Sequence, residues 1–127
     1  THTYFLNSTG LDLNSDTSGA YSSAADVAKL AAAFMHDYPA YFEVSTNDSV
    51  SIPVSGRMVT AKATALPLRT IPGIIGAKTG YTDLAGGNLV AAFDADINHP
   101  LIAVVLGSTE EGRFSDMKTL IEAARSQ

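Results

Sequence analysis

Apolar residues recur with a helical period between residues 23 and 37, and this pattern predicts an amphipathic helix there. Ser23 stands just before the segment and Asp26 follows in its first turn, which is the arrangement of a helix N-cap with an acidic partner. Pro39 disfavours helical backbone in the residue before it, so we expect the helix to end near Asp37. The positions on its apolar face are Val27, Leu30, Ala31, Phe34 and Met35.

Three apolar segments, at residues 73–81, 88–94 and 101–107, predict strands separated by short turns. Short connections favour an antiparallel meander. The third segment is wholly apolar, so we expect it to be covered on both faces. A second amphipathic pattern predicts a helix over residues 113–126. The sequence therefore predicts an α+β fold, with an antiparallel sheet packed against two helices in a single unit over residues 1–127.

The pattern is weaker between the first helix and the three strands. Alternating apolar residues at 50–54 predict a half-buried strand, and Pro53 favours an edge position for it. Ser55-Gly56 is a turn candidate, followed by a return strand at 57–61. Turn-forming residues predict irregular backbone in two further segments, an extended stretch leading into a loop at 1–16 and a loop with a short helical turn at 61–70.

Composition excludes several classes of function. The hydrophobic content of 46% and charged content of 17% are ordinary for a globular protein. The net charge of −5 offers no basic surface of the kind that binds nucleic acid. Cysteine is absent and the three histidines lack metal-ligand spacing, so we expect no disulfide and no metal site.

The chain shows no apolar run of about 18 residues and no signal peptide. It begins with Thr1 and not with methionine, which indicates a processed or excised piece of a longer polypeptide.

The candidate chemistry lies at the end of the predicted strand 73–81, where Lys78-Thr79-Gly80 follows an apolar run. A phosphate-binding P-loop needs glycine directly before the lysine, and Ala77 stands there instead. A lysine, a hydroxyl and a glycine at a strand end suit an anionic or hydroxylic ligand. Three residues alone do not distinguish such a site from a solvated strand end.

The longer segment 77–90 resembles the third active-site motif of serine-type D-alanyl-D-alanine carboxypeptidases, the low-molecular-mass penicillin-binding proteins of the peptidase S11 type. Further similar segments are 3–12, 21–28, 104–107 and 112–114, and the resemblance is weakest over 45–68. It implies a β-lactamase/transpeptidase-like fold and removal of the terminal D-alanine from peptidoglycan stem peptides through an acyl-serine intermediate. It also implies acylation by β-lactams, no cofactor, and a location outside the cytoplasmic membrane in the cell envelope or periplasm.

The resemblance also implies roles for individual residues. A peptide ending in D-Ala-D-Ala would lie along the Lys-Thr-Gly strand, with Gly80 allowing close approach. Lys78 would add positive potential, and Thr79 would bind the terminal carboxylate together with Arg113. The backbone N–H of Tyr81 would form half of an oxyanion hole. The other interpretation of Arg113 is a solvated arginine at a helix start.

The nucleophile of the family is not evident. Ser115-Asp116-Met117-Lys118 has the letters of Ser-x-x-Lys and Ser45-Thr46-Asn47 those of Ser-x-Asn, but both stand in the wrong order and context. We therefore expect the C-terminal portion of a catalytic domain that is inactive alone. Its uncovered apolar faces predict a homodimer or a swapped assembly. A class A β-lactamase fragment and a non-catalytic cell-envelope peptide-binding module remain as alternatives.

Overall fold

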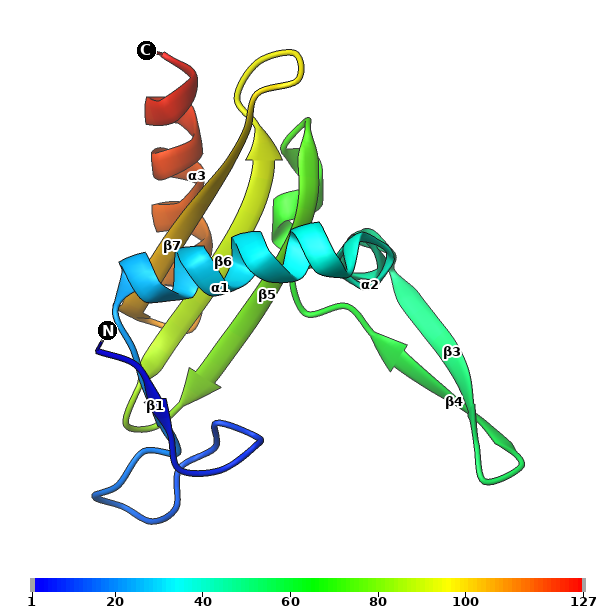
Figure 1. The fold of residues 1–127 in the computed structure, drawn as a ribbon, viewed down its shortest axis with the longest axis vertical. Coiled ribbons are helices and arrows are strands. Elements are labelled where there is room, and N and C mark those ends of the chain that lie inside the picture. Colours follow the sequence, from blue (N-terminus) through cyan, green and yellow to red (C-terminus); the bar gives the residue numbers. More distant parts are fainter. Residues whose placement is uncertain (1, 127) are drawn as a thin grey trace.

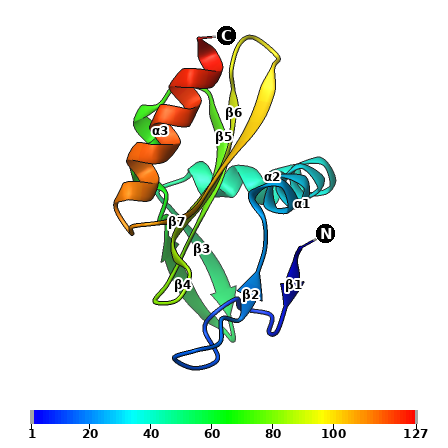
Figure 2. The ribbon, with the colours of Figure 1, turned by 90° about the vertical axis from the view of Figure 1, so that its left-hand side faces the viewer.

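The computed structural model describes residues 2–126 and is built around a three-stranded antiparallel sheet of order β5-β6-β7. The strands are β5 (Ile74–Thr82), β6 (Gly86–Asp94) and β7 (Pro100–Ser108). The helix α3 (Gly112–Arg125) covers one face, and α1 (Ala24–Asp37) with the short α2 (Pro39–Glu43) crosses the other (Figures 1 and 2). The predicted strands, helices and meander are thus confirmed.

The buried core lies between the sheet and α3. Alternate residues of the central strand β6 point toward this helix, while Met117 and Ile121, one helical turn apart, point back toward the sheet. Burying each such side chain contributes about 1.5–3 kcal/mol. The cluster is completed from β5, β7 and the 3₁₀ helix η2 (Leu66–Thr70), and comprises Ala65, Leu68, Ala77, Leu89, Ala91, Phe93, Val105, Met117 and Ile121.

The apolar sequence of β7 predicted that other elements cover both of its faces. Both α1 and α3 contact it, as predicted. It is nevertheless an edge strand of this sheet, and Val105 is its one buried residue within the described part of the chain. An apolar run therefore indicated contact on both faces without ensuring complete burial.

The N-terminus of α1 is capped as predicted. The Ser23 hydroxyl accepts a hydrogen bond from the Asp26 N–H at 3.2 Å. The Asp26 carboxylate itself accepts hydrogen bonds from the backbone N–H of His2 at 2.8 Å and from the Thr3 hydroxyl at 2.9 Å. These bonds, with that to the His2 N–H foremost, lower the pKa of Asp26. The carboxylate thereby fastens the first residues of the chain to the helix start.

The apolar face of α1 is largely open. Ala31 is buried, but Leu30 is 56% exposed and Phe34 is 42% exposed. A mainly apolar hollow of 480 Å³ separates α1, α2 and β5, and its walls include both of these exposed side chains. The exposure expected for this helix face is therefore observed.

The strands β3 (Ser49–Val54) and β4 (Arg57–Lys62) form the predicted hairpin. Ser55 and Gly56 both have positive φ, at 49° and 78°, which suits a two-residue hairpin turn. The prediction of a half-buried strand is wrong, since every residue of β3 except the partly buried Val50 is exposed, including Ile52 and Val54 on the apolar positions of the pattern. The hairpin projects away from the sheet, so neither of its faces is packed against it (Figure 1).

Two short strands, β1 (Tyr4–Phe5) and β2 (Ala20–Tyr21), pair near the N-terminus, and the Tyr4 and Tyr21 rings stack at 4.9 Å. The predicted helical turn within 61–70 is η2, and a further 3₁₀ turn, η1 (Val44–Thr46), follows α2. Among residues 2–126, no helix combines the length and apolar character needed to cross a membrane.

Candidate active site on the outer edge of β5

The Lys-Thr-Gly segment lies on β5, which pairs with β6 along one edge and leaves its other edge outside the sheet. The Ala77 N–H points to this outer edge, where it donates to the Ser45 hydroxyl at 2.8 Å. The register continues without a bulge from Gly76 to Thr82. Because backbone groups alternate along a strand, the N–H groups of Thr79 and Tyr81 point to the same outer edge.

The side chains of Lys78 and Thr79 lie on opposite faces of the sheet, as the strand period requires. Thr79 is 7% exposed, and its hydroxyl lies 2.6 Å from that of Thr64. Lys78 is exposed on the face that carries α1, and its Nζ donates to the Thr79 carbonyl. Thr64 could not be identified from the sequence, because a single threonine in a loop follows no periodic pattern.

Arg113, in the first turn of α3, reaches the same strand. Its Nη1 donates to the Gly80 carbonyl at 2.8 Å, and its guanidinium lies 5.0 Å from the centre of the Phe114 ring. The residue is only 7% exposed, so the interpretation as a solvated arginine is wrong. Its Nε is buried without a hydrogen-bond partner, and no carboxylate among residues 2–126 forms an ion pair with it.

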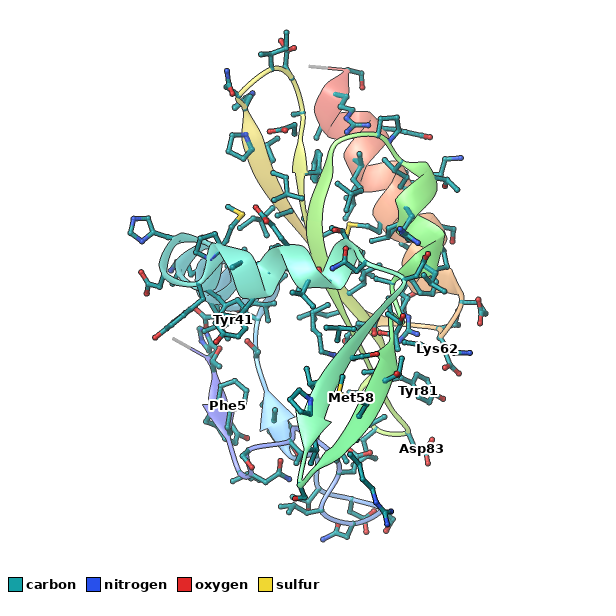
Figure 3. The ribbon with its side chains drawn as sticks, turned by 90° about the vertical axis from the view of Figure 1, so that its right-hand side faces the viewer. Phe5, Tyr41, Met58, Lys62, Tyr81 and Asp83 are labelled. Atoms are coloured by element: carbon teal, nitrogen blue, oxygen red, sulfur yellow. The ribbon has the colours of Figure 1, made fainter. Side chains whose placement is uncertain are left out.

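The loop between β1 and β2 borders the face of β5 that carries Lys78. A hollow of 580 Å³ lies between this loop and the strand. The Leu84 N–H donates to the Asp12 carboxylate at 3.2 Å, which ties the loop to the turn after β5. Tyr81 and Asp83 lie at that end of β5 (Figure 3). The sequence did not indicate the side chains that line this hollow opposite β5, which include Thr9, Asp16 and Ser18 of the loop and Tyr21 and Ser22 at the end of β2.

Neither letter match to the missing motifs forms a catalytic pair in the structure. The Ser45 hydroxyl donates to the Phe42 carbonyl at 2.7 Å while it accepts from β5. The Ser115 hydroxyl donates to the Gly112 carbonyl at 2.8 Å within its own helix. Lys118 lies 3.8 Å from Glu122. Each serine hydroxyl therefore serves the local backbone.

A metal site is also not supported by the arrangement of ligand side chains. Within residues 2–126, no three histidine, aspartate or glutamate side chains are grouped so that they could hold a metal ion. The site is thus built from one strand edge, one lysine, two hydroxyls and one buried guanidinium.

Comparison with known proteins places these features in a family. The Peptidase S11 family, described as D-alanyl-D-alanine carboxypeptidase, matches residues 1–110. The D-alanyl-D-alanine carboxypeptidase DacA of Haemophilus influenzae is 32% identical over 108 residues, which cover 84% of this chain and 27% of that protein. The corresponding DacA of Escherichia coli K12 is 30% identical over 94% of this chain and 28% of its own length.

Solved structures agree in fold. A D-alanyl-D-alanine carboxypeptidase from Mycobacterium tuberculosis superposes with a TM-score of 0.81 at 27% identity, covering 100% of this chain and 48% of that one. Penicillin-binding protein D2 from Listeria monocytogenes, in its ampicillin-bound form, gives a TM-score of 0.80 at 27% identity, over 96% of this chain and 48% of its own.

The chain spans about a quarter of the curated relatives it matches, 27% and 28% of their lengths. Its α+β architecture is part of a β-lactamase/transpeptidase-like fold. Family profile, relatives and fold agree, and the chain belongs to the Peptidase S11 family of D-alanyl-D-alanine carboxypeptidases.

Proposed function

We propose that these 127 residues form, as one unit, the substrate-positioning wall of a serine D-Ala-D-Ala carboxypeptidase. The whole enzyme removes the terminal D-alanine from peptidoglycan stem peptides through an acyl-serine intermediate. The observation that carries the proposal is the meeting of the Lys-Thr-Gly edge with the buried guanidinium of Arg113 at Gly80. The names of the relatives, which are carboxypeptidases of this type, support the substrate class.

The outer edge of β5 is suited to receive an extended peptide as an added antiparallel strand. The Ala77 N–H already donates to the Ser45 hydroxyl, so the part of the β5 edge that is available to the peptide begins at Thr79. The space beside Gly80 is open, since a Cβ at this position would have only Asn88 Cβ within 4 Å, at 3.8 Å. The backbone of a ligand therefore has room to approach Gly80. The Tyr81 N–H then donates to the carbonyl oxygen under attack, and the N–H of the serine nucleophile supplies the second donor.

Two groups serve the terminal carboxylate of the peptide. The Thr79 hydroxyl donates its proton to this carboxylate. The Thr64 hydroxyl lies 2.6 Å away and then acts as the donor of the threonine pair, since a hydroxyl both donates and accepts. Arg113 has donors beyond the one bonded to Gly80, and its buried charge has no carboxylate partner among residues 2–126. On the opposite face, Lys78 adds positive potential beside the serine.

Partners and location follow from the same proposal. β-Lactams acylate the same serine. Support for β-lactams as ligands comes from the Listeria relative, whose structure has been solved in cefotaxime- and ampicillin-bound forms. The whole enzyme acts outside the cytoplasmic membrane, where peptidoglycan lies. The isolated chain covers its open α1 face by forming a homodimer or a swapped assembly.

The experiment is labelling with fluorescent penicillin, followed by identification of the modified residue by mass spectrometry. The isolated chain is expected to stay unlabelled. A polypeptide in which residues 1–127 follow a Ser-x-x-Lys and a Ser-x-Asn segment is expected to be labelled at the upstream serine. Labelling of Ser45 or Ser115 would overturn the proposal.

Two further measurements separate the alternatives. Fast release of the label from the longer polypeptide would indicate a β-lactamase, because a carboxypeptidase of this type holds the acyl group long enough to be detected. Calorimetric titration of the unlabelled chain with a D-Ala-D-Ala peptide is expected to show no binding. Tight binding without any acylation would instead indicate a non-catalytic peptide-binding module.

A further inference from the structure

The hydrogen bond from Arg113 ends on the peptide group that carries the proposed oxyanion donor. The Gly80 carbonyl and the Tyr81 N–H belong to one amide, and this amide is trans, as are all peptide bonds among residues 2–126. In a trans amide the carbonyl and the N–H point in opposite directions. The Tyr81 N–H therefore faces the outer edge of β5 while Arg113 holds the other end of the same group.

Resting on the proposed function, we infer that Arg113 is a positioning residue of the oxyanion hole, acting through the Gly80–Tyr81 peptide group. Its guanidinium fixes the orientation of this amide. By donating to the carbonyl oxygen it also draws electron density from the amide nitrogen, which makes the Tyr81 N–H a stronger donor. This role is distinct from binding a substrate carboxylate, because it acts on every substrate whose carbonyl oxygen becomes negative.

The surroundings of Arg113 favour a strong effect. The bond to Gly80 is 2.8 Å long, it is charge-assisted, and the side chain is 7% exposed, so water screens it little. Hydrogen bonds in such a chain strengthen one another by roughly 10–30% each. The Arg113 N–H donates to the Thr109 carbonyl at 3.2 Å and the Phe114 ring lies under the guanidinium, which together limit its movement.

A second arginine on α3 provides a control for the loss of a contact between this helix and the sheet region. Arg125, at the other end of the helix, donates from Nη2 to the Asp94 carbonyl at 2.9 Å and also to that of Pro72. Like Arg113, it joins α3 to a backbone carbonyl of the sheet region and lies beside an aromatic ring, that of Phe93 at 5.7 Å. Its carbonyl partners do not belong to the Lys-Thr-Gly segment. Arg125 is exposed whereas Arg113 is buried, so a merely structural clamp at Arg113 would lower stability more than Arg125 does without making the Tyr81 N–H a stronger donor.

The first test measures the Tyr81 amide in the 127-residue chain itself by ¹H–¹⁵N NMR. Arg113→Met is expected to move the Tyr81 amide resonance more than Arg125→Met does, and Arg113→Lys to restore part of the change. A buried cation replaced by methionine often leaves a fold intact, so the variant suits this comparison. Equal and small Tyr81 shifts in Arg113→Met and Arg125→Met would overturn the polarisation of this amide.

The second test uses residues 1–127 joined behind a Ser-x-x-Lys and a Ser-x-Asn segment, with two acyl donors. One is a penicillin, which carries a carboxylate, and the other a peptide thioester whose leaving group carries none. Loss of an oxyanion donor lowers kcat about 10²–10³-fold, so a weakened donor in Arg113→Met is expected to slow acylation by both at least ~10-fold. Arg125→Met is expected to change either rate by less than about twofold.

The outcomes separate the inference from the function on which it rests. Slower acylation by the penicillin alone would assign Arg113 to carboxylate binding and overturn the inference. Unchanged acylation by both donors would overturn it as well. A parent polypeptide acylated by neither donor would overturn the proposed function and with it the catalytic role of Arg113, while the NMR comparison still decides whether Arg113 polarises the amide.

Discussion

Ser45 lies where the turn η1 meets the outer edge of β5, and its replacement by alanine tests whether this hydroxyl supports the site. The hydroxyl accepts from the Ala77 N–H at 2.8 Å and donates to the Phe42 carbonyl at 2.7 Å. Ala77 is buried, so water would not readily replace the lost acceptor. Ser45→Ala therefore leaves a buried backbone N–H without a partner.

An unpartnered buried donor costs about 1–3 kcal/mol, and the second bond contributes roughly 0.5–1.5 kcal/mol more where water cannot substitute. We expect Ser45→Ala to lower the free energy of unfolding by about 2 kcal/mol. For a chain of this length that corresponds to a fall in Tm of roughly 8 °C. Urea denaturation followed by circular dichroism measures the first quantity, and a thermal scan measures the second.

Ser115→Ala is the matched control. Its hydroxyl donates to the Gly112 carbonyl from an exposed helical position, and alanine favours helix, so the change should stay within about 0.5 kcal/mol. Equal effects of the two substitutions would refute the supporting role of Ser45. Penicillin labelling that is present in the wild-type chain and lost in Ser45→Ala would refute it more directly, because Ser45 would then be the nucleophile.

Three further changes test other parts of the structure. Gly76→Ala places a Cβ 2.3 Å from the Phe42 ring, so urea denaturation should show a free energy of unfolding lower by about 1–3 kcal/mol. A variant as stable as the wild type would contradict this close packing. The pKa of Asp26 is lowered, first by the hydrogen bond from the His2 N–H, so this carboxylate adds stability that is present above its unfolded-state pKa and lost as the pH falls through its folded-state pKa. Asp26→Asn should therefore reduce the loss of stability at acid pH, measured by denaturation at a series of pH values. An unchanged acid dependence would exclude Asp26 as its cause. Leu30→Ser should weaken self-association in sedimentation velocity, because Leu30 is 56% exposed on the open face of α1; a compact monomer in both forms would exclude assembly through this face.

The local pattern of the sequence was sufficient for the main elements. Apolar runs separated by turns located three strands, and period-3.6 repeats located two helices, to within a residue or two, because both signals depend on neighbouring residues only. The Ser23 cap and the Ser55-Gly56 turn followed from the chemistry of single residues. The Lys-Thr-Gly segment and its flanks identified the family before any contact was known.

The hairpin β3–β4 marks the limit of such patterns. Its alternation correctly predicted two paired strands, but burial depends on whether another element covers the strand, and the period does not contain that information. The same limit applies to the open face of α1, where an amphipathic pattern is present and most of the apolar side chains remain accessible.

The sequence by itself thus determined the elements, the family and the candidate residues on β5. Only the tertiary structure decided what those residues touch: Arg113 at the Gly80 carbonyl, 33 positions away, Thr64 at the Thr79 hydroxyl, and Ser45 at the Ala77 amide. Each contact joins segments that are distant in the chain. Such contacts depend on the path of the whole backbone, whereas strand and helix periods depend on a few adjacent residues.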